Sequence, residues 1–464
     1  MPEPHSPHHR VPATPTTAPA ATPTAAPATA PTAAPATAPA AAPTAAPAAA
    51  AARTRGRTTE RATGPADDLV DGPLAGLVVV SLEQAVAAPF ATRQLADLGA
   101  RVIKVERPGT GDLARGYDRT VRGMSSHFVW LNRGKESVQL DVRSPEGNRR
   151  LHALVDRADI LVQNLAPGAA ARLGIGHAQL APTHPGLISC DISGYGGTGP
   201  HHDRKAYDLL VQAEAGLLAI TGTPGTPSKV GLSIADICAG MYAYSGILTA
   251  LLDRARTGLG TRLEISMLEA LGEWMGYAEY FTRYGGTAPA RTGASHATIA
   301  PYGPFPTEDG GHVLLGLQNA HEWAAFCETV LRRPELLDDP RFEGNADRVA
   351  HRAELDALVR ETTLALSAAE LVDRLDEARI AHARQRTVSE FSAHPQLRAR
   401  GRWASFDSPV GELRGLVPPV TVHGRPPARL RPVPALGEHT ESVLAWIDAP
   451  VERRPEGMAP CPLS

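Results

Sequence analysis

A single carboxylate, Asp208, stands where it could act as a nucleophile. It follows a glycine-rich stretch, Gly194–Gly199, and opens an apolar helical segment in which Gln212 lies one turn later on the same face. Free backbone N–H groups and the helix dipole keep a first-turn acid ionised at neutral pH. An aspartate at such a position often only caps the helix. The residues alone leave both roles open.

The glycine-rich stretch, GYGGTG, also matches the dinucleotide-binding pattern GxGxxG, but its surroundings argue against that site. PHHD at 200–203 follows it, instead of a helix whose N-terminus could bind a pyrophosphate. The turn after the first expected strand, EQAVAAPF, contains no glycine. We therefore expect the glycines to fold a tight loop or to let the backbone pass close to a ligand.

Strand-like and helical segments alternate from residue 73 onward. GLVVVSLE (Gly76–Glu83) and RVIKVERP (101–108) are apolar runs typical of strands covered on both faces, and a helix ending at Gly99 joins them. ESVQLDV, DILVQNL and GLISCDIS continue the pattern. Strand–helix–strand units close as right-handed parallel crossovers. The sequence therefore predicts an α/β fold with a Rossmann-like parallel sheet.

Composition divides the chain into regions. Residues 1–72 contain a tract of only Ala, Pro and Thr, which has no large apolar side chain to bury and predicts a disordered tail. We expect residues 73–280 to form a large domain that 395–448 complete, with a long helix from about Ser233 to Arg256. Residues 281–394 should form linkers and a smaller α+β domain, and 449–464 a flexible C-terminus.

Bulk properties exclude several classes of function. The net charge of −3 over 464 residues argues against nucleic acid as the main partner. The sequence contains no run of eighteen apolar residues, so we expect no membrane-spanning helix. The four cysteines lack CxxC spacing, so we expect reduced thiols in a cytoplasmic protein, with neither a metal site nor disulfides; they are Cys190, Cys238, Cys327 and Cys461.

The order of several segments resembles CoA-transferase family III, which includes formyl-CoA transferase and carnitine CoA-transferase and is related to α-methylacyl-CoA racemase. The resemblance runs from Leu74 to Ile447 through LAGLVVVSLEQAVAAPFATRQLADLGARVIKVERPGTGD, LNRGKESVQLDV, DILVQNLAPGAAARLG, SGYGGTGP, KAYDLLVQAEAG, GLSIADICAG, TGLGTRLEISMLEA and LGEHT. It implies an interlocked homodimer with acyl-CoA thioesters and carboxylic acids as substrates, and no permanently bound cofactor.

The resemblance further implies that Asp208 is the acyl-accepting nucleophile. Carboxylate attack on a thioester gives a mixed anhydride, which the released CoA thiolate converts to an aspartyl-CoA thioester. The acceptor acid then takes CoA through a second anhydride, in a pocket that excludes water. Nearby glycine loops could supply N–H groups to the oxyanion. The resemblance places CoA contacts at Val86, Ala87, Arg107, Lys135, Asn164, Leu165, Arg172 and Lys205.

Departures from the family pattern bear on the substrate. Val86 stands where formyl-CoA transferase has glutamine, and the second domain has no tetraglycine loop, so formyl or oxalyl substrates are not expected. The second-domain run resembles transferases of branched C4 or C5 dicarboxylates such as mesaconate, citramalate or itaconate, with succinyl-CoA. Arg283, Arg291 and His296 could pair with a distal carboxylate.

Two alternative functions remain open. An acyl-CoA racemase needs an acid/base pair, and its branch of the family has histidine immediately before the aspartate. Tyr207 occupies that place here and favours transfer, although His177 and His296 remain possible bases. The other alternative is a catalytically silent CoA-binding scaffold whose proline-rich tail recruits partners.

Overall fold

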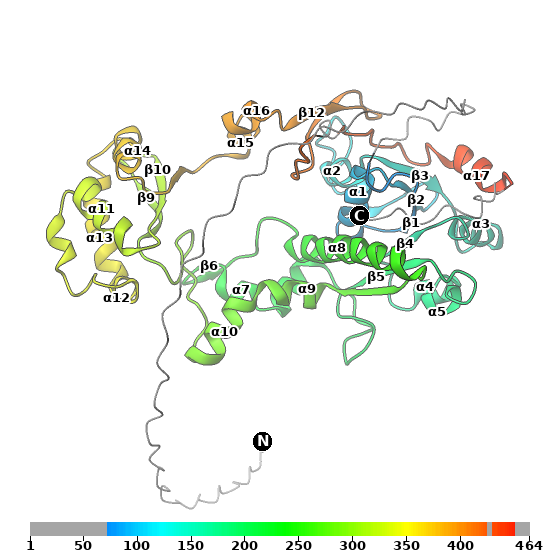
Figure 1. Ribbon diagram of the computed structural model, residues 1–464, viewed down its shortest axis with the longest axis horizontal. Coiled ribbons are helices and arrows are strands. Elements are labelled where there is room, and N and C mark those ends of the chain that lie inside the picture. Colours follow the sequence, from blue (N-terminus) through cyan, green and yellow to red (C-terminus); the bar gives the residue numbers. More distant parts are fainter. Residues whose placement is uncertain (1–71, 425–428, 451–464) are drawn as a thin grey trace, which may run out of the picture. The chain divides into compact units, whose positions relative to one another are not determined.

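The computed structural model describes residues 72–424 and 429–450. Its centre is a six-stranded sheet in the order β3-β2-β1-β4-β5-β8, in which every neighbouring pair is parallel (Figure 1). The strands are β1 (Val78–Leu82), β2 (Arg101–Glu106), β3 (Lys135–Gln139), β4 (Ile160–Gln163), β5 (Ile188–Ser193) and β8 (Arg262–Ser266). The predicted parallel α/β sheet is therefore confirmed. The predicted tail lies outside the described residues.

Both faces of this sheet are buried, which explains the continuous apolar runs of its strands. Val79 faces a core formed with α1 (Ala87–Asp97), α8 (Ile234–Thr257) and α9 (Met267–Trp274). Val80 faces the opposite core, to which α3 (Pro145–Val155) and α17 (Thr440–Asp448) contribute. The strand order reverses between β1 and β4, and ligands of open parallel sheets bind beside the carboxyl ends of strands at such a point.

Shorter elements complete this part of the chain. They are the short helices η1 (Leu113–Gly116), α2 (Ser126–Asn132), α4 (Ala169–Arg172), α5 (His177–Leu180), α6 (Asp208–Glu214), α7 (Leu217–Ile220) and α10 (Gly276–Gly285), and the strands β6 (Gly222–Thr223) and β7 (Thr226–Pro227). The cysteines at 190, 238 and 327 are free and buried, and Cys461 lies outside the described residues. A cytoplasmic location stays a prediction.

Helix α8 is long and apolar enough to cross a membrane by length and composition alone, with a mean hydropathy of 1.4 over an eighteen-residue window. A helix of this length and hydropathy was not expected from the sequence. One face of the helix, which includes Ala239, Ala243 and Ile247, is completely buried in the core beside α1. That packing is typical of the central helix of a folded domain.

A separate apolar core lies between residues 300 and 380. It is built on an antiparallel sheet, β11-β10-β9, whose strands are β9 (Tyr302–Pro306), β10 (His312–Gly316) and β11 (His382–Arg384). Its helices are α11 (Ala320–Ala325), η2 (Phe326–Leu331), η3 (Pro334–Leu337), α12 (Asn345–Ala350), α13 (Arg352–Thr363) and α14 (Ala368–Glu377).

The segment that follows the second core returns to the part of the chain that holds the large sheet. After α15 (Val388–Ser392) and α16 (Pro395–Ala399), the hairpin of β12 (Trp403–Phe406) and β13 (Leu413–Leu416) follows. Phe406 of this hairpin shares an apolar cluster with Phe128, and Val443 of α17 lies in the core beneath the large sheet. The domain boundaries given above stay predictions.

A buried network of charges lies at the carboxyl end of β1. Glu83 Oε1 accepts hydrogen bonds from Lys135 Nζ (2.6 Å) and Lys104 Nζ (3.3 Å), and Lys104 Nζ also donates to Asp112 Oδ2 (2.6 Å). All four side chains are fully buried. Burial alone would raise the pKa of Glu83, but the two ammonium groups outweigh it and lower that pKa below its usual value. Two acids and two lysines therefore balance each other.

We expect Glu83→Gln to destabilise the protein by about 3 kcal/mol at pH 6, because it leaves a buried lysine charge without its carboxylate. Urea denaturation monitored by circular dichroism measures this loss. Glu146→Gln is the control, because Glu146 pairs with Arg149 and Arg150 on an exposed surface. Equal denaturation midpoints for Glu83→Gln and Glu146→Gln would contradict a stabilising role of the buried network.

Candidate active site

Asp208 is the first residue of α6, but its carboxylate is directed at the N-terminus of α8. Asp208 Oδ1 accepts hydrogen bonds from Ala235 N (2.8 Å) and Asp236 N (3.4 Å). Ser233, the residue that precedes the first turn of α8, makes no side-chain cap. Asp208 therefore caps α8 from another helix. The sequence predicted that N–H groups of the helix opened by Asp208 would hold its carboxylate, whereas the N–H groups that it contacts belong to α8.

Gln212 holds the second oxygen of the same carboxylate. Its Nε2 donates to Asp208 Oδ2 at 2.7 Å, which confirms that the two residues share one face of α6. Its Oε1 accepts from Val230 N at 3.0 Å, in the segment that leads into α8. Gln212 is completely buried. Asp208 is thus held by three donors and its orientation is fixed by packing.

A second carboxylate, Asp236, stands beside Asp208 in the first turn of α8. Burial and, secondly, the charge of Asp208 raise the pKa of Asp236 to about 7, and the backbone N–H of Ala87 in α1 acts in the opposite direction. Asp236 was not among the predicted site residues. The segment GLSIAD gave the same signal as KAYD, because each places an acid in the first turn of an apolar helix.

The glycine loop before α6 uses its amides within the protein. Gly196 N donates to Ser193 Oγ (3.0 Å) and Gly197 N to Glu264 Oε1 (2.6 Å). A Cβ atom at Gly194 would lie 2.2 Å from Cβ of Ala206. These contacts fit a tight loop, one of the two predicted roles, and they leave the amides of Gly196 and Gly197 unavailable to an oxyanion.

A cavity of about 1040 Å³ opens at the carboxyl ends of β1 to β4. Three of the predicted CoA contacts line it: Arg107, Leu165 and Arg172. Arg143, which sequence reasoning missed, is a third guanidinium on the same wall. In residues 72–424 and 429–450 none of the three arginines is in an ion pair. The signal for Arg143 was its place just after β3, matching that of Arg107 after β2.

The other predicted contacts lie elsewhere. Val86 and Ala87 are buried at the start of α1, and Asn164 exchanges two hydrogen bonds with the backbone of Gln84. Lys135 is enclosed in the charge network and presents no surface to a ligand, so we do not keep it as a CoA contact.

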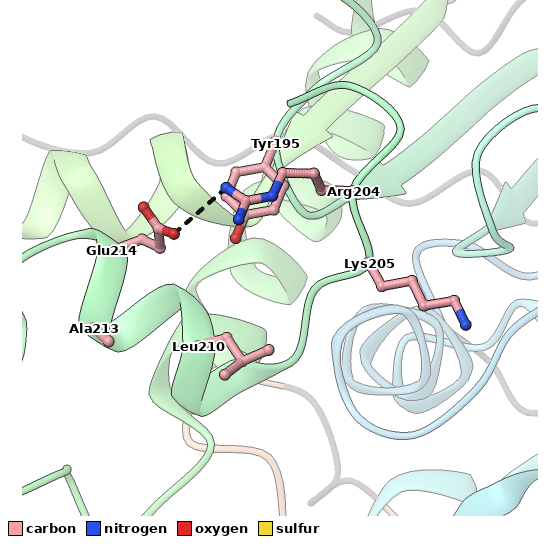
Figure 2. A pocket seen from close by; sticks show the side chains of 6 residues that line it. All are labelled: Tyr195, Arg204, Lys205, Leu210, Ala213 and Glu214. Atoms are coloured by element: carbon pink, nitrogen blue, oxygen red, sulfur yellow. Dashed lines mark ion pairs between the residues drawn. The ribbon is translucent and has the colours of Figure 1, made fainter. Parts of the chain in front are cut away.

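Lys205 lines a shallower hollow of about 470 Å³ together with Tyr195, Arg204 and Glu214 (Figure 2). Arg204 and Glu214 form an ion pair of 3.7 Å in that hollow, and the Lys205 side chain points away from both. The structure thus separates Lys205 from the three arginines of the large cavity.

The side chains proposed for a distal carboxylate have protein partners. Arg291 donates from all three of its guanidinium nitrogens to carbonyl oxygens of Ala219, Thr223 and Pro224. Arg283 pairs with Glu279, and His296 stacks on Tyr302 with ring centroids 5.2 Å apart. His177 Nδ1 lies 3.2 Å from Ser189 Oγ. Among the described residues no group of three or more His, Cys, Asp or Glu could hold a metal ion.

Comparison with known proteins places these features in a family. A family model described as "CoA-transferase family III" matches residues 74–440. The chain is 33% identical to succinate–glutarate CoA-transferase of Agrobacterium fabrum, covering 82% of this chain and 96% of that protein. It is 39% identical to acetyl-CoA:oxalate CoA-transferase of Acetobacter aceti, covering 70% and 84%.

Two further similarities concern another acid and the fold. The chain is 35% identical to succinyl-CoA–D-citramalate CoA-transferase of Chloroflexus aurantiacus, covering 79% of this chain and 92% of that protein. The crystal structure of a CAIB/BAIF family protein from Brucella suis, 33% identical, superposes with a TM-score of 0.71 over 81% of this chain and all of that one.

Proposed function

The chain belongs to CoA-transferase family III and is a CoA-transferase, and we propose that it transfers CoA from an acyl-CoA thioester to a dicarboxylic acid through covalent aspartyl intermediates. The observation that carries this proposal is the pair of carboxylates, Asp208 and Asp236, at the N-terminus of α8. The names of the three relatives, which pair CoA with succinate, glutarate, oxalate or citramalate, support a dicarboxylate.

Of the two carboxylates, we assign attack to Asp208, as predicted from the sequence. Gln212 and the first N–H groups of α8 hold its two oxygens in a fixed orientation. Burial and the charge of Asp208 raise the pKa of the neighbouring Asp236 to about 7. At neutral pH a carboxyl with that pKa is protonated in part of the molecules, and the protonated form does not attack a thioester.

The proposed reaction has four balanced steps. An Asp208 oxygen attacks the thioester carbonyl, the C–S bond breaks, and CoA leaves as thiolate. The thiolate attacks the aspartyl carbonyl of the anhydride, which forms the aspartyl thioester and releases the donor acid. The acceptor carboxylate attacks that thioester and expels the thiolate. The thiolate then attacks the acceptor's acyl carbon, which completes the new thioester and restores the aspartate.

We expect purified protein to move CoA from succinyl-CoA to at least one of glutarate, citramalate, mesaconate, itaconate and oxalate, and Asp208→Asn to lose this activity. Mass spectrometry of wild-type protein incubated with succinyl-CoA alone should find a CoA adduct on the peptide containing Asp208. Asp236→Asn should retain the adduct, because it leaves Asp208 and its hydrogen-bond donors in place. An adduct on Asp236 in the Asp208→Asn variant would contradict this assignment.

We also propose that the cavity beside β1 to β4 holds the nucleotide part of CoA. Phosphates of a CoA molecule need cationic partners, and Arg107, Arg143 and Arg172 supply three of them in this cavity.

Oxalyl substrates were not expected from the sequence, but the acetyl-CoA:oxalate CoA-transferase that is 39% identical gives no support to that exclusion. We therefore propose a dicarboxylic acid as the acceptor, with oxalate among the candidates.

Arg143→Ala should raise the KM for the acyl-CoA about tenfold and leave kcat unchanged, because one charge-assisted hydrogen bond contributes about 1.5 kcal/mol. Steady-state kinetics with CoA and 3′-dephospho-CoA thioesters measures this and shows which phosphate the arginine reads. The matched control is Arg149→Ala, an exposed arginine of α3 that pairs with Glu146. A KM equal to that of the control would argue against the assignment of the cavity.

The chain is further proposed to form a homodimer. Large apolar side chains are exposed together on α9 and α10, and patches of this kind mark interfaces; they are Trp274, Tyr277, Tyr280, Phe281 and Tyr284. We expect light scattering after gel filtration to give twice the mass of the chain. Tyr280→Glu should reduce the measured mass to that of a single chain. A monomeric wild-type protein would contradict this proposal.

A further inference from the structure

The LGEHT segment, residues 436–440, lies along β3, which is the edge strand of the large sheet. The N–H and C=O groups on the free side of an edge strand need other partners. Ser137 N donates to His439 Nδ1 (3.3 Å), and His439 N donates to Ser137 O (3.0 Å). Gln139 N donates to Thr440 Oγ1 at 3.0 Å. The LGEHT segment therefore supplies the missing partners of β3.

Gln139 connects this covered edge with the turn that follows β2. Its Oε1 accepts from Gly109 N at 2.7 Å, and Gly109 has a φ of +75°, in the left-handed region that favours glycine. Gly111 N donates to Arg107 O at 3.0 Å and closes the same turn. A Cβ atom at Gly437 would lie 2.3 Å from Gln139 Nε2, so the LGEHT segment packs directly on this side chain. The turn that begins with Arg107 is thus held by a side chain that the LGEHT segment holds in its place.

The two backbone segments joined in this way both line the cavity of about 1040 Å³. The two residues before Gly109 and the four residues after Gln139 belong to its lining, and they include Arg107 and Arg143. Among the described residues that line the cavity, neither Gln139 nor Thr440 occurs. Any effect of these two side chains on a ligand therefore passes through the backbone that carries the arginines.

The LGEHT segment also contacts the residue that holds an acid of the cavity. Glu106 belongs to the lining, and an unbalanced carboxylate there would repel a phosphate. Arg115 pairs with Glu106 through two nitrogen atoms, at 2.8 and 2.7 Å. Ser137 Oγ donates to Glu106 Oε1 at 2.7 Å and accepts from Gly437 N at 2.8 Å. Glu106 is thus balanced within the protein, and the positive charge of the arginines is left for a ligand.

We propose that the LGEHT segment positions the phosphate-binding arginines of the cavity, with Thr440 and Gln139 as its positioning residues. This inference rests on the proposed function of the cavity as the site of the CoA nucleotide. Thr440 holds the backbone of Gln139, and the Gln139 side chain holds the turn at Gly109. Arg107 and Arg143 extend from the two segments that are joined in this way. A segment near the end of the chain thereby determines how well CoA binds at strands near its beginning.

Binding of CoA itself, measured by isothermal titration calorimetry, tests the proposal without any transfer reaction. Thr440→Val keeps the shape of the side chain but removes the acceptor of Gln139 N, and we expect the Kd for CoA to rise about fivefold, as for one lost neutral hydrogen bond. Gln139→Met removes the acceptor of Gly109 N and should weaken binding by a similar factor. Thr440→Ser keeps the hydroxyl and should bind CoA as the wild type does. The matched control is Ser442→Ala, because Ser442 lies in the same helix and its hydroxyl donates to His439 O.

Steady-state kinetics separates positioning of the arginines from a loss of catalytic power. In Thr440→Val the KM for the acyl-CoA should rise, while kcat stays within about twofold of the wild-type value. Thr440→Val should also change KM less when Arg143→Ala is already present, because one of the arginines that it positions is then missing. A purely structural role of Thr440 would give the same change of KM in both backgrounds.

The outcomes distinguish this inference from the proposed function. A wild-type protein that fails to bind CoA would contradict the proposed site of the nucleotide, and this inference with it. CoA binding that is equal in the wild type, Thr440→Val and Gln139→Met would overturn this inference alone. If Thr440→Val does not fold, Gln139→Met decides the question in the same assays.

Discussion

Two carboxylates share one helix N-terminus, and the site is organised around the cost of holding them there. Asp208 and Asp236 repel each other, and a buried acid without partners would be neutral. The first N–H groups of α8 offset this repulsion for Asp208, whereas burial and the charge of Asp208 raise the pKa of Asp236 to about 7. One helix end thus holds Asp208 in a fixed orientation beside a second acid whose ionisation depends on it.

The charges nearest to this helix end do not all serve binding. Lys104 and Lys135 are enclosed with Glu83 and Asp112, whereas Arg107, Arg143 and Arg172 line a cavity without carboxylate partners among the described residues. The two lysines belong to β2 and β3, and their ammonium groups meet Glu83 just after β1, whereas the three arginines come after β2, β3 and β4. The same sheet therefore positions both the buried charge network and the cationic cavity.

Much of this arrangement was predictable from local pattern. The strand-like runs located five of the six parallel strands, β1 to β5, and the spacing of Asp208 and Gln212 placed them on one helix face. The environments of Asp236, Lys135 and Arg291 were not predictable, because they depend on contacts between residues far apart in the chain. The raised pKa of Asp236 comes from burial and from Asp208 on another helix, and Arg291 donates to carbonyl oxygens of residues 219–224. A sequence shows that a side chain is charged, while only packing shows whether it is free.

The contact between Gly194 and Ala206 restricts how such an enzyme can diversify. With only 2.2 Å available for a Cβ at position 194, any side chain there would push back the segment that leads into α6. Libraries that randomise this loop should therefore return glycine at 194 whatever substrate is selected. A preference for a different acid would have to arise from changes in neighbouring segments. The close contact between Gly194 and Ala206 would stay the same.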